Sequence, residues 1–388
     1  MSNAPIFDID PQAFWIDPYP TLAKMRRETP IAYVPQLDAT LLTRRDDIFS
    51  EEKRIAVFSS DQPGGLMTTL MGENMMRKDG PAHMAERKMI FPTVSPRTVR
   101  DVWKAQFEAA TTKILDNLAS QQSADLVRDF AMPVSAEALK AITGLTNMHF
   151  AEMDRVSQGM IDGIANHTGD PKVEAHCNDC TASIDAHIDA QIPVLQANPD
   201  MSLLSVSMKA GMPEQQIRAN IKLAISGGQN EPRDAIAGAI AALIEHPEQL
   251  QKALEGQVTW LQVFEEYARW MSPIGMSPRR IAKQYTLNGV TFEPETRAFL
   301  MFGSGNRDEK IFQNPDRFDV TRDTTKAISF GAGPHFCAGA WASRCMIAEV
   351  ALPMFFARFK DLALTEPVAY RGWAFRGPLA VHAEWLVQ

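Results

Sequence analysis

The sequence predicts a mainly α-helical protein with a small β region. Apolar residues recur every three or four positions through the middle of the chain, as at Val102, Phe107, Ile114 and Leu118, and this spacing is typical of amphipathic helices. Strand-like stretches are few, and no internal repeat or Gly/Ser-rich linker divides the chain. We therefore expect a single domain that spans residues 1–388.

The expected elements follow in order along the chain. Stretches rich in strand-forming residues lie at 31–43, at 280–300 with an Asn288-Gly289 turn, and at 381–387. Helical spacing covers residues 102–118 and 130–142, and a longer apolar pattern runs over 217–249. A further helix is expected over 341–359. Helices therefore dominate, and the strands form only small sheets.

Composition excludes several classes of protein. The chain is 45% hydrophobic and 22% charged, which is ordinary for a globular protein and excludes disordered and fibrous classes. Its net charge of −8 gives no sequence-wide basic surface for nucleic acid. The N-terminus lacks a basic and apolar signal segment, and no run of about 18 apolar residues follows. We expect a cytoplasmic protein that binds neither nucleic acid nor membrane, with reduced cysteines.

One glycine-rich loop has the character of a cysteine ligand site. Residues 330–339 read FGAGPHFCAG, with Cys337 close to His335 and to several glycines. The glycines allow close backbone approach, and their free N–H groups can stabilise a thiolate. A cysteine buried for packing is the alternative interpretation.

The order F-x-x-G-x-x-x-C-x-G in this loop resembles the cytochrome P-450 family, in which this cysteine binds heme iron. The resemblance implies a single-domain P-450 fold that holds heme b between a long distal helix and the cysteine loop. It implies Cys337 as the metal ligand, with Phe330, Gly331 and Gly339 as loop residues that contact the cofactor. A thiolate ligand favours O–O cleavage, so the expected chemistry is oxygen activation with O2 as co-substrate.

Other segments match the family in the expected order. His83 and Arg87 lie four residues apart on one helix face, where both can reach a single anion. The resemblance assigns them to the heme propionates together with Arg280 and His335. Each of these residues, taken alone, is also compatible with an ordinary surface charge.

An E-x-x-R pair strengthens the resemblance. Glu266 and Arg269 are separated by three residues in a predicted helix, a pattern that is also common on solvated helix faces. In the family, Arg317 would complete a buried Glu–Arg–Arg network with them. The role implied for these residues is structural.

The predicted distal helix departs from the family pattern. Most members carry a glycine followed by an acid–threonine pair that relays protons, whereas this chain reads Gly228-Gln-Asn230-Glu231-Pro232. Because proline has no N–H, we expect the helix to open near Gly227 and to free the Gly228 carbonyl. A carboxyl group in an apolar pocket has a raised pKa, which suits proton transfer. We assign Glu231, Asn230 and Gly228 to catalysis. Alternatively, Glu231 pairs with an arginine and only holds the kink.

Two short motifs resemble a finer branch of the family. The Glu-Pro pair and the turn WAFRGP are similar to bacterial O-demethylases of guaiacol and related methoxyarenes. This resemblance implies that Phe375, Gly227 and Ile274 contact a small aromatic substrate, and Leu70 lies in a loop expected to line the same pocket. Ring or alkyl hydroxylation, peroxide-driven oxidation and, last, a non-catalytic heme sensor remain alternatives.

Electrons must come from another protein. The chain has no dinucleotide fingerprint, flavin site or four-cysteine iron–sulfur pattern, which implies a separate ferredoxin or a flavin/iron–sulfur reductase. A candidate docking surface contains Arg97, Arg100, Lys104 and Arg344. The pair Cys177-x-x-Cys180 lacks the second pair that zinc sites usually have, so we expect no metal there.

Overall fold

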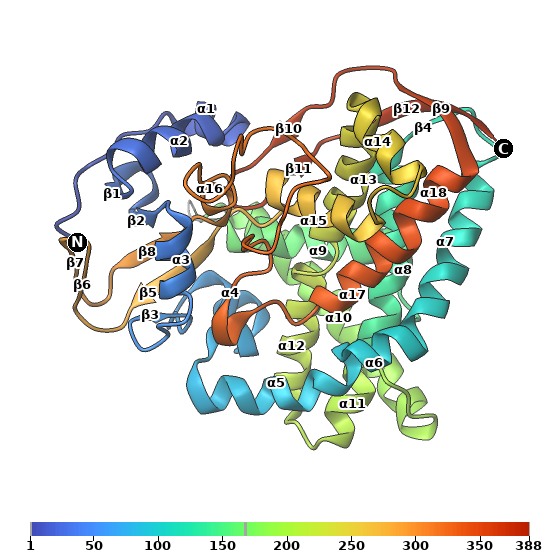
Figure 1. Cartoon of the computed structure of the whole chain (residues 1–388). Coiled ribbons are helices and arrows are strands. Elements are labelled where there is room, and N and C mark those ends of the chain that lie inside the picture. Colours follow the sequence, from blue (N-terminus) through green and yellow to red (C-terminus); the bar gives the residue numbers. More distant parts are fainter. Residues whose placement is uncertain (1, 167–168, 388) are drawn as a thin grey trace. The chain divides into compact units, whose positions relative to one another are not determined.

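The computed structural model describes residues 2–166 and 169–387 and confirms a mainly helical fold with small sheets (Figure 1). The chain forms two compact units. Unit 1 comprises residues 1–62, 238–337 and 366–381, and unit 2 comprises residues 63–237, 338–365 and 382–388. The expectation of one domain over the whole chain stays a prediction.

Unit 1 contains a five-stranded sheet with the strand order β1-β2-β8-β5-β3. Strands β2 and β8 are parallel, and the other pairs are antiparallel. Two small ribbons, β6–β7 and β10–β11, complete its strands. The bounds are β1 (Ile31–Val34), β2 (Ala39–Leu42), β3 (Phe58–Ser59), β5 (Ser277–Ile281), β6 (Tyr285–Leu287), β7 (Val290–Phe292), β8 (Arg297–Leu300), β10 (Tyr370–Arg371) and β11 (Gly377–Pro378).

Helices of unit 1 are mostly short. Phe58 and Phe292 pack edge to face, with ring centroids 5.4 Å apart, in the core of this unit. Asn288 (φ 49°) and Gly289 (φ 82°) form the predicted turn of the β6–β7 hairpin. The helical elements are α1 (Pro11–Ile16), α2 (Tyr19–Glu28), η1 (Pro35–Leu37), α3 (Arg45–Glu51), α14 (Pro247–Leu254), α15 (Trp260–Met271), α16 (Phe302–Gly305) and η5 (Gly333–His335).

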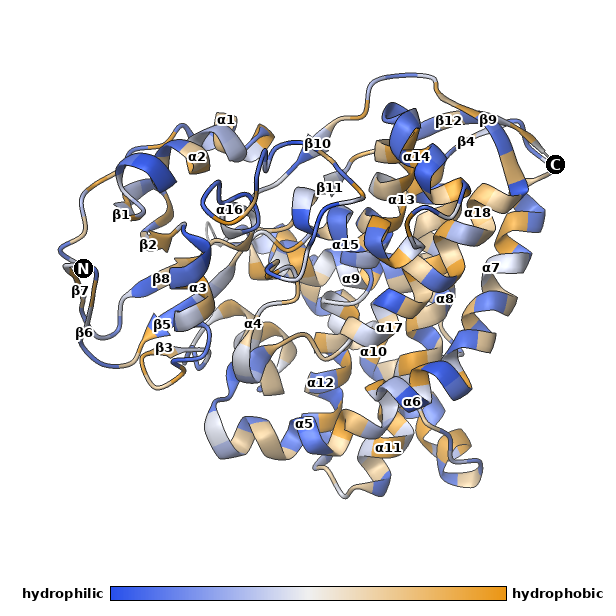
Figure 2. Cartoon of the chain, in the orientation of Figure 1, coloured by the Kyte–Doolittle hydropathy of each residue, from blue (hydrophilic) through white to orange (hydrophobic). Residues whose placement is uncertain are grey.

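Unit 2 is a helical assembly with one small antiparallel sheet, β4-β12-β9. Helix α9 packs against α8, α10 and α12, and polar and apolar residues alternate along α5 and α7 (Figure 2). The elements are α4 (Leu66–Met71), η2 (Met75–Arg77), α5 (Gly80–Val94), α6 (Pro96–Thr98), η3 (Val99–Trp103), α7 (Lys104–Leu118), β4 (Ser123–Asp125), η4 (Val127–Ala131), α8 (Met132–Thr143), α9 (Phe150–Ile164), α10 (Pro171–Ala197), α11 (Leu203–Lys209), α12 (Glu214–Ser226), α17 (Ala340–Arg344), η6 (Cys345–Ala351), α18 (Leu352–Arg358), β9 (Phe359–Leu364) and β12 (His382–Val387).

The long apolar pattern over residues 217–249 forms two helices instead of one. Helix α12 ends at Ser226, and α13 (Asn230–Glu245) begins after three non-helical residues. The predicted opening at Gly227 and Gly228 is therefore present. Since Pro232 cannot donate a backbone hydrogen bond, the helix cannot run through this point without losing one.

One stretch of helix has the length and apolar composition of a membrane span. It covers Ala340–Arg358, and 61% of its most apolar window is buried within the protein. Within the described part of the chain, no other helix passes this test. Burial of this extent is typical of a helix in the core of a protein.

Candidate functional site

The cysteine loop of unit 1 depends on its glycines. Gly331 (φ 71°) and Gly333 (φ 64°) have left-handed backbone conformations. A Cβ atom at Gly333 would lie 3.0 Å from the Lys53 side chain, so a larger residue would be both strained and crowded. The Cys337 N–H donates to the Phe330 carbonyl at 2.9 Å, and the Cys337 side chain is exposed and forms no disulfide. The loop thus presents a thiol on a tightly folded backbone.

Two neighbouring arginines of β5 have different partners, and Arg279 is the one linked to the cysteine loop through Glu52. Arg280 donates to the Asp61 carbonyl at 2.8 Å and to Glu295 at 2.6 Å, so its guanidinium is already occupied by acceptors. Arg279 is 3% exposed, and its Nη2 lies 2.6 Å from Glu52. The other oxygen of Glu52 accepts from Ala332 N in the cysteine loop at 3.4 Å. Neighbouring strand residues face opposite sides of a sheet, and spacing alone did not decide which arginine faces the loop.

Unit 2 places the predicted His83 and Arg87 on helix α5. His83 is buried and Arg87 half-buried, and their four-residue spacing puts them on one helix face. Glu86, between them, is buried and pairs with Lys78 and with Asn220 on α12, where Asn220 Nδ2 lies 2.7 Å from Glu86 Oε2. These contacts hold the face of α5 that carries the histidine.

The break between α12 and α13 is held by helix α8. The Ser135 hydroxyl donates to the Gln229 carbonyl at 2.8 Å and lies 3.4 Å from the Gly228 carbonyl. The Gly228 carbonyl, which we expected to be free, thus has the Ser135 hydroxyl at the edge of hydrogen-bond distance, while the shorter bond goes to Gln229. A Cβ at Gly228 would lie 2.4 Å from the Ala224 carbonyl, which explains the glycine.

Asn230 is tied to helix α9. Its Nδ2 donates to Gln158 Oε1 at 3.1 Å, and its Oδ1 lies 3.4 Å from the Ser157 hydroxyl. The side chain is 6% exposed. Both of its polar groups thus have partners on α9, and its catalytic role stays a prediction.

Glu231 is the exceptional group of this region. Both carboxyl oxygens are buried and have no hydrogen-bond partner among the described residues. Burial raises the pKa of Glu231 to about 7 although the residue's own backbone N–H lowers it; the negative charge of Asp234 adds to the rise, and Arg233 opposes it. Arg233 pairs with Asp234 at 2.9 Å and with Asp154 at 3.0 Å. The alternative in which an arginine neutralises Glu231 is therefore not what the structure shows.

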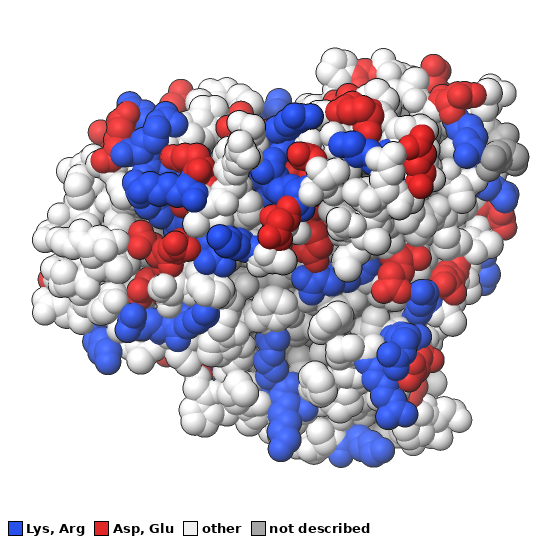
Figure 3. Space-filling view, viewed as in Figure 1, with Lys and Arg blue, Asp and Glu red and all other residues white. Residues whose placement is uncertain are grey.

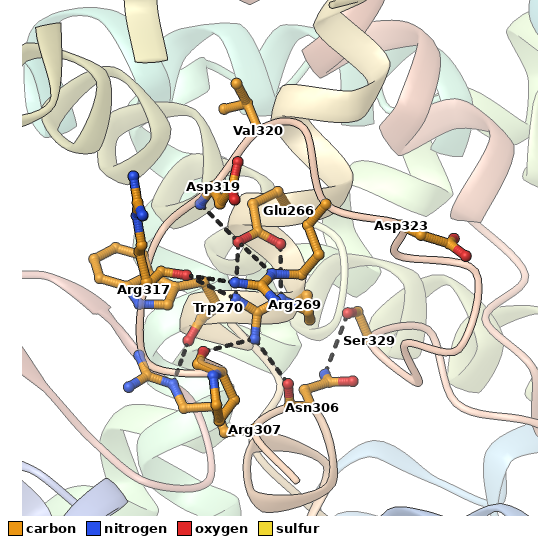
Figure 4. A network of polar contacts seen from close by, with 12 residues as sticks. Glu266, Arg269, Trp270, Asn306, Arg307, Arg317, Asp319, Val320, Asp323 and Ser329 are labelled. Atoms are coloured by element: carbon orange, nitrogen blue, oxygen red, sulfur yellow. Dashed lines mark hydrogen bonds and ion pairs between the residues drawn. The ribbon is translucent and has the colours of Figure 1, made fainter. Parts of the chain in front are cut away.

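A second buried carboxylate, Glu266 on α15, is fully paired (Figure 4). Arg269 donates to its two oxygens at 2.7 and 2.8 Å, and Arg322 lies 3.2 Å away. The third member of the network is Arg322 and not Arg317, whose exposed side chain points away while its carbonyl accepts from Arg269. The segment between α16 and η5 places Arg322 inward, and this return of the chain to α15 has no signal in the local sequence.

The predicted substrate contacts of unit 1 lie together. Ile274 and Phe375 form an antiparallel bridge, and the adjacent Gly275 N–H donates to the Ala374 carbonyl at 2.8 Å. A Cβ at Gly275 would lie 1.9 Å from the Trp373 carbonyl, so only glycine fits this turn. Phe375 is 38% exposed, which leaves its ring available.

The two predicted contacts of unit 2 lie on different elements. Leu70 on α4 packs against the core of this unit, where its Cδ1 would lie 3.1 Å from a Cβ at Gly163 of α9. Gly227 is exposed at the end of α12.

The C-x-x-C pair serves helix packing. The sulfurs of Cys177 and Cys180 fill the space left by Gly163 and Gly159 on α9. Burial raises the pKa of Cys177 to about 11, which disfavours the thiolate needed for metal binding or redox chemistry. His176, Asp179 and Cys180 could offer three ligand atoms within 4.8 Å, but the Arg155 guanidinium lies 2.7 Å from Asp179 and 3.6 Å from the Cys180 sulfur.

Comparisons with known proteins agree with this geometry. The cytochrome P-450 family model matches residues 171–364. Cytochrome P-450 107B1 of Saccharopolyspora erythraea is 27% identical, covering 94% of this chain and 93% of its own. Linalool 8-monooxygenase of Pseudomonas putida is 25% identical over 87% of each chain. The structure of the P-450 BioI with an acyl carrier protein has a TM-score of 0.88 and 23% identity, covering 97% of this chain and all of that one.

The family's cofactor fits the residues present. Heme-thiolate enzymes need an accessible cysteine on a loop that tolerates close approach, and Cys337 follows two glycines with positive φ. Glu231 is also buried without a hydrogen-bond partner in the described chain. Such a group is typical of a functional site. The chain therefore belongs to the cytochrome P-450 family of heme-thiolate monooxygenases.

Proposed function

We propose that this monooxygenase uses Glu231 in place of the family's acid–threonine pair to carry protons during oxygen activation. The observation that carries this proposal is the buried Glu231 carboxyl group, which has no partner in the described chain and a pKa of about 7. A group that is half protonated near neutral pH can both take up and release a proton. Ser135 and Asn230 act as positioning residues, because they hold the turn from which Glu231 projects.

Cys337 is the proposed iron ligand, and His83, Arg87 and His335 are the proposed propionate partners. Arg280 completes this proposed set, as the resemblance implies, whereas the buried Arg279 is paired with Glu52 beside the cysteine loop. Phe330, Gly331 and Gly339 shape the loop around the cofactor. When bound, the heme supplies the site at which O2 is reduced and split.

The proposed reaction is O-demethylation of a small methoxyarene. Hydroxylation of the methyl carbon consumes O2, two electrons and two protons and releases water, and the hemiacetal then collapses to a phenol and formaldehyde. The Glu-Pro pair and the WAFRGP turn support this class, and the neighbouring Phe375 and Ile274 offer an aromatic and an aliphatic surface. Gly227 and Leu70 remain proposed contacts.

Peroxide-driven oxidation is the second candidate, and the same carboxyl favours it. Peroxide activation needs a group that takes a proton from one oxygen and returns it to the other, which Glu231 can do. Product formation with peroxide alone, compared between the parent protein and Glu231→Thr, tests it. Equal and negligible turnover in both would exclude this route.

The electron donor is proposed to be a separate ferredoxin or a flavin/iron–sulfur reductase, with the protein located in the cytoplasm. Lys and Arg side chains gather over α5 and α6 in unit 2 (Figure 3). Most of the candidate docking residues already have acidic neighbours: Arg97 and Arg100 pair with Asp101, and Lys104 pairs with Glu349. Arg344 lies over the exposed ring of Trp341. We expect charge reversal at Arg97 and Arg344 to slow reduction, and unchanged reduction kinetics would remove this docking surface.

Optical titration of the purified ferric holoenzyme tests the substrate class. Guaiacol, syringol and 4-methoxybenzoate are compared with the same rings without the methoxy group. A high-spin shift of the Soret band, followed by formaldehyde release in equal amount to phenol, is expected only for methoxyarenes. Stronger shifts with alkylbenzenes, or hydroxylated products without formaldehyde, would overturn the O-demethylase proposal and leave the monooxygenase fold intact.

A further inference from the structure

A buried carboxylate at the end of helix α3 lies against the cysteine loop of unit 1. Glu52 directly follows the last residue of α3 and is 2% exposed. The C-terminus of a helix carries a partial negative charge, so this carboxylate gains nothing from its own helix. It depends on other partners to compensate for its burial. Glu52 has such partners on two sides, one on strand β5 and one in the cysteine loop.

The first partner is Arg279 of β5, which forms a buried ion pair with Glu52. The Arg279 side chain is 3% exposed, and its Nη2 donates to Glu52 Oε1 at 2.6 Å. Arg279 Nε is also buried and has no hydrogen-bond partner among the described residues. A buried guanidinium needs a counter-charge, and Glu52 supplies it. The pair therefore fixes one oxygen of Glu52 toward the sheet.

The second partner is the backbone of the cysteine loop. Glu52 Oε2 accepts from the Ala332 N–H at 3.4 Å. The residues on both sides of Ala332 also lie close to Glu52. A Cβ atom at Gly331 would lie 3.3 Å from Glu52 Oε2, and one at Gly333 would lie 3.2 Å from the Glu52 carbonyl oxygen. The two glycines therefore allow the loop backbone to approach Glu52 closely.

Backbone hydrogen bonds connect this contact with Cys337. The Cys337 N–H donates to the Phe330 carbonyl at 2.9 Å, and the Phe336 N–H donates to the Gly333 carbonyl at 3.2 Å. Ala332 lies between these two acceptors in the chain. A displacement of Ala332 would therefore move both carbonyls that hold the cysteine and its neighbour.

We infer that Glu52 is a positioning residue for Cys337, because it holds the Ala332 N–H with one oxygen while Arg279 holds the other. The inference rests on the proposed role of Cys337 as the iron ligand. Both oxygens of Glu52 face donors, which a carboxylate can satisfy together. A glutamine at this position has only one acceptor oxygen. Its NH2 group would face either the Arg279 guanidinium or the Ala332 N–H, and both of these are donors.

The test uses the ferric holoenzyme and two readouts. The iron–sulfur stretching band of the resonance Raman spectrum reports how uniformly the sulfur is held. Hydrogen exchange of a peptide that covers residues 328–339 reports the protection of the loop backbone. In Glu52→Gln we expect a broader band, and loop exchange faster by about tenfold, since one anchor of the backbone is lost. Cys337→Ser should lack the band, because the ligand atom is then no longer sulfur.

Glu51→Gln is the matched control. Glu51 is the neighbouring carboxylate of α3 and is 1% exposed, but it pairs with Arg54 at 2.8 Å and lies 3.5 Å from the Tyr285 hydroxyl. The control removes the same charge from the same helix end, and we expect neither readout to change. Glu52→Asp keeps the charge and both acceptor oxygens on a shorter side chain. Its values should lie between those of the parent and Glu52→Gln, and it keeps the test available if Glu52→Gln does not fold.

The outcomes separate the role of Glu52 from that of Cys337. A broader band and faster loop exchange in Glu52→Gln but not in Glu51→Gln, with Glu52→Asp in between, support the positioning role. Equal values in Glu52→Gln and Glu51→Gln overturn that role, and the proposed ligand survives if Cys337→Ser lacks the band. An iron–sulfur band that persists in Cys337→Ser overturns both.

Discussion

Glu266 and Glu231 both carry buried carboxyl groups on helices, yet their hydrogen-bond partners differ. Glu266 on α15 accepts hydrogen bonds from Arg269, Arg322 and the Asp319 backbone N–H. Glu231 on α13 has two buried oxygens with no such donors, and its pKa rises to about 7. A fully paired buried charge stabilises one conformation, whereas an unpaired one titrates near neutral pH and is available for chemistry. The difference lies in the donors around each group.

The largest effect is expected from Glu266→Gln. This change leaves the buried Arg269 guanidinium without its carboxylate, and we expect a loss of about 3–5 kcal/mol in the free energy of unfolding. Urea denaturation of the holoenzyme measures it. Arg317→Gln is the control, since its exposed side chain should contribute less than about 0.5 kcal/mol. Equal losses in both variants would contradict the structural role of Glu266.

Glu231 should make stability depend on pH in the opposite sense to an ordinary salt-bridged acid. Its pKa rises from 4.5 to about 7 on folding, so the folded state binds more protons between these values. Stability is full below pH 4.5 and falls by about 3 kcal/mol as pH rises to 7. Glu231→Gln should remove this part of the decline in denaturation curves taken across the range. A parallel decline in the variant would show that Glu231 does not titrate with the raised pKa.

Turnover measurements should distinguish the role of Glu231 from that of Glu266 most clearly. We expect Glu231→Gln to reduce product formed per electron consumed by about a hundredfold, with the missing electrons recovered as peroxide. Its unfolding midpoint at pH 6 should stay close to that of the parent. NADH consumption, product and peroxide are measured in the same reaction with a surrogate redox pair. Normal coupling in Glu231→Gln would show that Glu231, like Glu266, has only a structural role.

Arg322→Gln tests the corrected member of the network. It removes a charged hydrogen bond to Glu266 at 3.2 Å but leaves Arg269 in place, so we expect a loss of about 1.5–3 kcal/mol. The measurement is urea denaturation alongside Glu266→Gln. A larger loss in Arg317→Gln than in Arg322→Gln would restore the arginine assigned from the family pattern.

The smallest effect is expected at Ser135. Ser135→Ala removes the hydroxyl that binds the Gln229 carbonyl at 2.8 Å, which should cost about 1 kcal/mol. Because Ser135 holds the turn before Glu231, coupling should also fall modestly. Thr143→Ser on the same helix α8 keeps its hydroxyl bond to the Leu139 carbonyl and serves as the control. Unchanged coupling in Ser135→Ala would show that the turn holds its shape without this bond.

Much of the molecule could be predicted from local patterns. The helix break at Gly227, the Asn288-Gly289 turn and the need for glycines around Cys337 each follow from the properties of one or two neighbouring residues. Local patterns do not specify which partner a side chain takes when the candidates lie far away in sequence. Arg279 and Arg280 are adjacent and chemically identical, and only the strand's orientation decides which one faces Glu52.

The sequence by itself determined the family, the glycine-rich loop around Cys337 and the Glu231-Pro232 pair, because these depend on residue identity and spacing. Tertiary structure alone decided which charges are paired. Arg322 pairs with Glu266 from a distant loop, Ser135 donates to the Gln229 carbonyl at the helix break, and Arg233 pairs with Asp154 and Asp234. Pairing needs distances of about 3 Å, which no linear pattern specifies. The sequence therefore shows that Glu231 is present, but only the fold shows that its carboxyl group has no partner among the described residues.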